Sequence, residues 1–257
     1  MKKRALFALV GAVTAGLIAV VVPTAHASSA LPSVTRVSSA AAAGQGTIQA
    51  QDLPTELVAA AAADTAVLRP GQHRIYFHFR KNHKDPTKSS LTLYRVTARG
   101  EGLPPTYTKL GAWRAGSGIG GTGIGQNACA LGQGWLPNGW YNAHRDGPAH
   151  DTNFNTNVNG GLIFGIVWRL QDTARGCDGI KRTELFIHSE MTPGRKQACR
   201  PANYRENQCW DGPADYASNG CIKLKPADIK QAARLARAWG GPRPDQKHYP
   251  RLLLVTG

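Results

Sequence analysis

A cysteine and a histidine in the second half of the chain have the types and surroundings that nucleophilic chemistry requires. His188 ends the apolar segment 185–187, and Cys221 directly follows Gly220 within the stretch 218–224. A thiol becomes a strong nucleophile when an imidazole takes or balances its proton, because the thiolate is the reactive species. We expect the two side chains to form a thiolate–imidazolium pair, with N–H groups around Gly220 and Cys221 as an oxyanion hole. Together these groups indicate acyl transfer through a thioester.

The cysteine count supports the same thiol. The chain has five cysteines, so at least one stays free unless it pairs with another chain. The other four can pair in three ways, and closeness along the chain favours a bridge between Cys199 and Cys209. Cys129 and Cys177 then form the second bridge, and Cys221 remains the free thiol.

Strand signals dominate the region that must position these groups. Alternating or continuous apolar patterns typical of strands occur near 75–80, 91–95, 141, 162–170, 184–188 and 252–255. One helix is predicted over 226–239, because Pro226 stands in its first turn, its apolar residues share one face, and glycines follow it. We therefore expect a mostly β domain with one or two short helices.

The first 68 residues are expected to precede the folded domain. Residues 1–27 have the cations, the apolar run and the small-residue pattern of a secretion signal, which predicts cleavage after Ala27. An uncleaved membrane anchor is the alternative. Residues 28–68 are rich in Ala, Ser, Thr and Val and are interpreted as a flexible linker, although 56–63 also fits a short helix. The folded domain is expected to comprise 69–257.

The chain is strongly basic. It carries 31 Lys+Arg against 16 Asp+Glu, a formal net charge of +15. A protein this basic concentrates on polyanions, which for an exported protein are anionic polymers of the cell envelope. Aromatic residues make up only 7% and do not alternate with runs of Lys and Arg, so no nucleic-acid partner is expected.

The residues around the nucleophile also resemble a known family. His-Ser at 188–189, followed by Ser-x-Gly-Cys-Ile-x-Leu at 218–224 and by Asp228, resembles the catalytic signature of L,D-transpeptidases, the YkuD-type domain. The resemblance is specific over about 185–230, whereas 70–180 agrees only as a β-rich lead-in. It implies a β-sandwich-like domain that crosslinks peptidoglycan, or attaches proteins to it, through a catalytic cysteine.

The resemblance also implies roles for individual residues. Cys221 is the nucleophile, His188 is its base, and Ser189 orients the imidazole through its backbone carbonyl. Gly220 belongs to the oxyanion site. Substrate contacts are expected from three residues that flank the nucleophile: Ser218, Asn219 and Lys223.

Two positions depart from the family pattern. Asn219 stands where the family usually has a second His, and Lys223 stands where Arg is more common. An Asn side chain donates and accepts hydrogen bonds but does not titrate near neutral pH. We expect the departures to affect rate or substrate more than the identity of the nucleophile.

The resulting hypothesis is a secreted, wall-associated L,D-transpeptidase that acts on peptidoglycan stem peptides. It is expected to be a monomer without metal, cofactor or a membrane span after signal cleavage. Cys221 attacks the third residue of a stem tetrapeptide, D-alanine leaves, and an amine of a second stem resolves the thioester. Three alternatives remain open: an L,D-carboxypeptidase in which water resolves the thioester, an exported wall-targeting hydrolase, and a non-catalytic wall-binding module.

Overall fold

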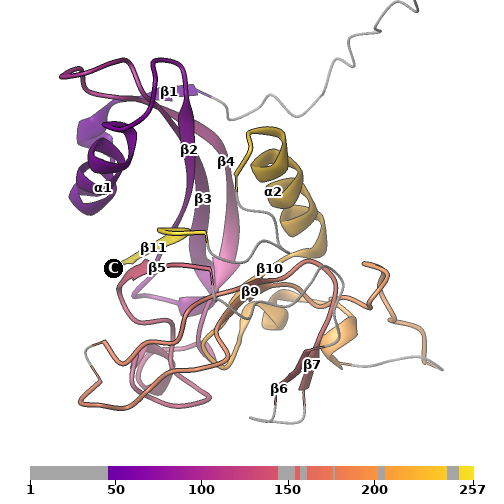
Figure 1. Ribbon diagram of the computed structural model, residues 1–257. Helices are drawn as coiled ribbons and strands as arrows, with labels where there is room; N and C mark the ends of the chain where they lie inside the picture. The colour runs from indigo at the N-terminus through magenta and orange to yellow at the C-terminus, as the bar shows by residue number, and fades with distance from the viewer. Residues whose placement is uncertain (1–45, 144–153, 157–160, 176, 202–205, 242–248) are drawn as a thin grey trace, which may run out of the picture. The chain divides into compact units, whose positions relative to one another are not determined.

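The computed structural model shows one mixed, curled sheet, which has nine strands among the described residues, together with two α-helices (Figure 1). It describes residues 46–143, 154–156, 161–175, 177–201, 206–241 and 249–257. The strand order is β5-β11-β2-β3-β4-β10-β9-β8, and β1 pairs separately with β4. A two-stranded hairpin, β6–β7, lies outside this sheet.

The elements have the following bounds. The strands are β1 Gly46–Ile48, β2 His73–Arg80, β3 Ser89–Thr97, β4 Thr106–Gly116, β5 Gly139–Tyr141, β6 Phe154–Thr156, β7 Gly161–Ile163, β8 Trp168–Arg169, β9 Phe186–His188, β10 Ile222–Leu224 and β11 Leu253–Thr256. The α-helices are α1 Thr55–Thr65 and α2 Pro226–Ala238. Short 3-10 helices span Ala50–Asp52, Pro86–Lys88, Ile124–Gln126, Glu206–Gln208 and Pro213–Tyr216.

Three long antiparallel strands, β2, β3 and β4, form the centre of the sheet, and their side chains alternate between its faces. On one face Phe77 and Leu93 belong to the main core, in which Ile229 of α2 is also buried. On the other face Tyr76 packs in a second cluster with Leu57 of α1. The two helices accordingly lie on opposite sides of these strands (Figure 1).

The sheet curls until the ends of its strand order meet. β5 and β8 stand at opposite ends of that order, yet Ala143 just after β5 forms an isolated bridge with Leu170 just after β8. The amide of Gln171 also donates to the carbonyl of Asn142 at 3.0 Å. Buried side chains from both halves of the curl share the main core, so the curvature encloses it.

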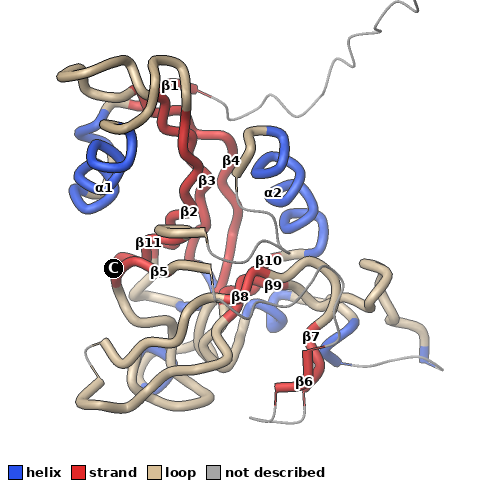
Figure 2. The backbone as a smooth tube through the Cα atoms, viewed as in Figure 1, coloured by secondary structure: helices blue, strands red, loops and turns tan. Residues whose placement is uncertain are grey.

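The strands that carry the candidate site are short and are supported by longer neighbours. β10 pairs antiparallel with the end of β4 and parallel with β9. Parallel neighbours need a long connection, and the described part of 189–221 is made of loops and 3-10 helices (Figure 2). β10 leads into α2, where Pro226 at the first turn supplies a φ suited to a helix.

The predicted mostly β class and the predicted helix near 226–239 are confirmed. The segment from Gly46 to Leu68 was expected to be a flexible linker but is folded onto the sheet. β1 pairs with β4, and α1 buries Leu57 against the face of the sheet opposite the main core. The ordered fold therefore includes this segment instead of starting near Arg69. The predicted signal 1–27 and the rest of the linker lie outside the described residues.

The predicted strand 162–170 is interrupted in the structure. β7 ends at Ile163 and β8 begins at Trp168. Gly165 between them has a φ of +82°, and a Cβ there would come within 2.8 Å of Met191. The backbone must therefore turn at this glycine, and one apolar run becomes two short strands.

Both predicted disulfides are present. Cys129 is joined to Cys177 and Cys199 to Cys209. Cys221 is free and buried. In the part of the chain that the structure describes, no helix is long and apolar enough to cross a membrane.

Candidate active site

The strand register places Cys221 and His188 on the same face of neighbouring strands. In the parallel pair β9–β10, Ile222 lies opposite Ile187, and both side chains belong to the main core. Cys221 is therefore level with Phe186, and these two side chains pack together on the opposite face. His188 faces the same way as Phe186, because side chains alternate along a strand. One strand spacing and two residues of rise place the Cα atoms of Cys221 and His188 roughly 8 Å apart, which the two side chains can bridge.

The imidazole of His188 is oriented by the next residue. Its Nδ1 lies 3.3 Å from the carbonyl oxygen of Ser189, the contact that the family resemblance implies. A carbonyl only accepts, so Nδ1 carries the proton and Nε2 keeps the lone pair of a base. The catalytic roles of both residues stay predictions.

Burial favours the neutral forms of both the thiol and the imidazole. Burial raises the pKa of the Cys221 thiol to about 11, although the Phe186 amide and the charge of Lys223 act in the opposite direction. Burial lowers the pKa of His188 to about 3, and the charge of Lys223 adds to this effect. This differs from the expected thiolate–imidazolium pair, because withdrawing both groups from water disfavours their charged forms.

The thiol is directed toward the backbone in the resting structure. Its Sγ lies 3.6 Å from the carbonyl oxygen of Glu184 and donates to it. Among the hydrogen bonds between described residues, none joins Sγ to the ring of His188. A rotation of the Cys221 side chain away from Glu184 is therefore needed before the imidazole can take the thiol proton.

Three consecutive carbonyls at the nucleophile are each held by a different side chain. Arg182 donates to the carbonyl of Asn219 (3.4 Å), Ser117 donates to that of Gly220 (3.1 Å), and Ser218 donates to that of Cys221 (2.6 Å). The amide of Ser218 also donates to the carbonyl of Gly118 at 2.8 Å. The glycine-rich segment 116–125 thus supports the turn before Cys221.

Gly220 was predicted to contribute to the oxyanion site. Its N–H donates to the Oγ of Ser218 at 3.2 Å, so this amide is already engaged. Its φ is +114°, and a Cβ at this position would overlap Nη2 of Arg182. Glycine is thus required for the backbone conformation and for the close approach of the guanidinium. An oxyanion role requires Ser218 to release this N–H.

The three residues expected to contact substrate have different surroundings. The side chain of Asn219 is exposed. Lys223 is mostly buried and forms an ion pair with Glu190. The Oγ of Ser218 is occupied by the hydrogen bonds of the turn. Of the three, Asn219 is the best placed to contact a ligand.

Three buried residues at the site were not predicted: Ser117, Arg182 and Glu190. Ser117 lies inside a glycine-rich segment, and Arg182 lies in a polar stretch before β9 that has the pattern of an exposed loop. Glu190 neutralises Lys223 beside His188. The only sequence signal for Arg182 and Glu190 is their closeness to His188 along the chain.

Neither a metal centre nor a known relative identifies the site. Within the described ranges, no group of three or more His, Cys, Asp and Glu side chains is arranged to hold a metal ion. No protein-family model, curated protein or solved structure matches the chain. A functional proposal therefore depends on the thiol, the oriented imidazole and the braced turn.

Substitution of Gly220 by Ala tests the turn. We expect the free energy of unfolding to fall by about 2–3 kcal/mol, because Ala at positive φ is strained and its Cβ displaces the guanidinium of Arg182. Chemical denaturation measures the change. Gly212→Ala is the control, because Gly212 has an extended φ of −171° and nothing lies within 4 Å of its Cβ position. Equal effects of the two substitutions would contradict the prediction.

Proposed function

We propose that the protein is an exported L,D-transpeptidase, a cysteine acyltransferase that acts on peptidoglycan stem peptides. In this proposal Cys221 is the nucleophile, His188 is its general base, and Ser189 orients the imidazole. The β-sandwich-like fold of that family is part of the same proposal.

One observation carries the proposal. The single cysteine outside the two disulfides lies on the same sheet face as an imidazole whose Nε2 is free to act as a base. The histidine precedes the cysteine along the chain, as in the signature that the sequence resembles and opposite to the order in papain-like proteases.

The geometry supports a general-base mechanism that starts from neutral groups. As Sγ of Cys221 attacks the carbonyl carbon of the third stem residue, its proton passes to Nε2 of His188. The tetrahedral intermediate collapses, the bond to D-alanine breaks, and Nε2 returns the proton to the leaving amine. An amine of a second stem then attacks the thioester, forms the new amide and restores the thiol with the same proton count.

Several properties of the whole chain favour an extracellular site of action. Two disulfides persist in oxidising compartments. The net charge of +15 favours retention on anionic wall polymers. These properties and the predicted signal support a secreted, wall-associated enzyme.

Intact-mass spectrometry of the unreduced protein without its predicted signal tests the proposal. After incubation with a disaccharide-tetrapeptide, we expect a mass increase equal to the substrate minus D-alanine, with D-alanine in solution. The Cys221→Ala variant is expected to form no adduct, because it lacks the attacking sulfur. A folded wild-type protein that forms no adduct and releases no D-alanine would contradict acyl transfer and favour the wall-binding module.

The acceptor distinguishes the remaining enzymes. With excess amine acceptor, a transpeptidase gives a crosslinked dimer in proportion to the D-alanine released. An L,D-carboxypeptidase gives tripeptide instead, because water resolves the same thioester. Lysis of foreign cells by the added protein would favour the wall-targeting hydrolase.

A further inference from the structure

Arg182 is a buried cation in an unusual position. Only 2% of its surface is exposed, and its backbone pairs with Thr173 in an isolated antiparallel bridge. Among the ion pairs between described residues, none involves Arg182. Burying a charge without a counter-ion is costly unless polar groups replace the lost water. The surroundings of the guanidinium must therefore supply those groups.

Backbone carbonyls surround the guanidinium. Its acceptors are the carbonyls of Ala128, Gly134 (3.1 Å), Trp135 (3.4 Å) and Asn219 (3.4 Å). Three of them belong to the loop 128–135, whereas Asn219 belongs to the turn before Cys221. The planar fork of an arginine can hold several acceptors at fixed directions, so this one side chain joins the loop to the turn.

The same guanidinium lies close to the nucleophile. Its Nη2 occupies the space that a Cβ of Gly220 would fill. The charged groups that act on the Cys221 thiol are Arg182 and Lys223, which lower its pKa, and Glu184, which raises it. Lys223 is paired with Glu190, whereas the carbonyls around Arg182 leave its charge unneutralised.

We infer that Arg182 is a positioning residue for Cys221, which holds the turn before the nucleophile and keeps a fixed positive charge beside the sulfur. Negative charge develops near this sulfur during attack, and a charge that is already in place stabilises it without reorganisation. The inference rests on the proposed function only where it calls Cys221 a nucleophile.

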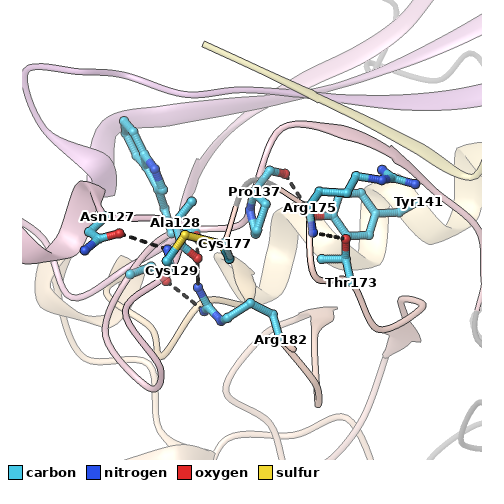
Figure 3. Close-up of a disulfide and its surroundings, with 11 residues drawn as sticks. Asn127, Ala128, Cys129, Pro137, Tyr141, Thr173, Arg175, Cys177 and Arg182 are labelled. Carbon is cyan, nitrogen blue, oxygen red and sulfur yellow. Dashed lines mark hydrogen bonds between the residues drawn. A yellow bond between two sulfur atoms is a disulfide. The ribbon is translucent and has the colours of Figure 1, made fainter. Parts of the chain in front are cut away.

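The Cys129–Cys177 disulfide holds the two segments that form this arrangement. Figure 3 shows the guanidinium of Arg182 directed toward the carbonyl of Ala128, next to the disulfide. Cys129 lies on the loop that provides three acceptors, and Cys177 lies on the segment between Thr173 and Arg182. The bridge therefore fixes the loop relative to the arginine that binds it.

Arg182→Met removes the charge but keeps an unbranched side chain. At about pH 8 we expect Cys221 to react with iodoacetamide roughly tenfold more slowly, because loss of the nearby charge lowers the thiolate fraction. The rate ratio of anionic iodoacetate to neutral iodoacetamide is also expected to fall. These reagents are similar in size, so the ratio reports the charge near the sulfur independently of access.

Arg182→Lys keeps the charge but loses the fork, and it provides a test if the Met variant does not fold. We expect its iodoacetate to iodoacetamide ratio to stay within twofold of wild type. Hydrogen–deuterium exchange of the peptide that contains Asn219–Cys221 is expected to speed up, because an ammonium group cannot hold all four carbonyls. D-alanine release is expected to fall at least tenfold.

Arg175→Met is the matched control, since Arg175 lies on the same segment and donates to the carbonyl of Trp140, away from the thiol. A folded Arg182→Met variant with wild-type alkylation rates and an unchanged ratio would overturn the inference. So would wild-type exchange at the turn in Arg182→Lys. Neither readout needs a substrate, so a failure of the proposed function leaves the test of Arg182 intact.

Discussion

Replacing His188 by Gln is expected to slow thioester formation roughly 10³-fold at about pH 7, within the range that a general base contributes. Gln fills similar space but cannot accept the thiol proton and carry it as a charge. The neutral thiol of Cys221 is then left with water as its proton acceptor. Single-turnover release of D-alanine measures the effect, because it reports the acylation step alone.

The pH profile separates this mechanism from a preformed ion pair. In the wild type, the pKa of His188 is lowered to about 3. The imidazole is therefore unprotonated and able to accept a proton, and the rate is expected to be nearly constant from about pH 5 to 9. In His188→Gln, reaction requires the thiolate. Because the pKa of Cys221 is raised to about 11, the thiolate fraction rises about tenfold for each pH unit below that value. The ratio of the wild-type rate to the His188→Gln rate is therefore expected to fall roughly 100-fold between about pH 7 and 9.

His73→Gln is the matched control, because the Nε2 of His73 also contacts a backbone carbonyl, that of Trp239, at 2.7 Å. It lies on β2, which is not adjacent to β9 or β10 in the sheet, and is expected to leave the rate unchanged. A bell-shaped wild-type profile centred near neutral pH would contradict the neutral pair. An equal loss in both variants would show that the effect is structural.

The fold was predictable where local patterns agree with tertiary packing. The alternation in β2 and β3 and the amphipathic pattern of α2, which begins at Pro226, match the observed elements. The longest strand, β4, was missed, because a register shift between Leu93 and Tyr94 of β3 leaves Leu110 unpaired and breaks the period of two. The segment 46–68 was expected to be a linker, with a helix at 56–63 only as the alternative, since its alanine-rich helix gains stability from packing on Tyr76 and not from a strong pattern of its own.

The candidate site was predictable in its reactive groups and in the Ser189 carbonyl that orients the imidazole. Cys221 and His188 have characteristic neighbours along the chain, and the odd cysteine count independently selects the same thiol. The parts that brace the turn, Ser117 and Arg182, act through backbone carbonyls that lie far from them in sequence. Such contacts depend on how β4, the 128–135 loop and the turn pack together, and no local periodicity encodes that packing.

Removing the Cys129–Cys177 disulfide is expected to lower the free energy of unfolding by about 4 kcal/mol. The bridge closes a loop with a sequence separation of 48, and the loss of chain entropy in the unfolded state grows with loop length. The Cys199–Cys209 bridge has a separation of 10, and its removal is expected to cost about 3 kcal/mol. Denaturant titration of paired Cys→Ser variants measures both changes. A Cys221→Ala background prevents exchange with the free thiol.

The two bridges differ more in their effect on the turn than in their effect on stability. Loss of Cys129–Cys177 frees the loop whose carbonyls hold Arg182, so hydrogen exchange of the peptide around Asn219 is expected to accelerate. The Cys199–Cys209 variant is the internal control. Its bridge lies within the connection between β9 and β10, and among the described residues neither cysteine is hydrogen-bonded to Arg182. Faster exchange in both variants would indicate general loosening. Faster exchange in the first alone would tie this disulfide to the geometry of the nucleophile.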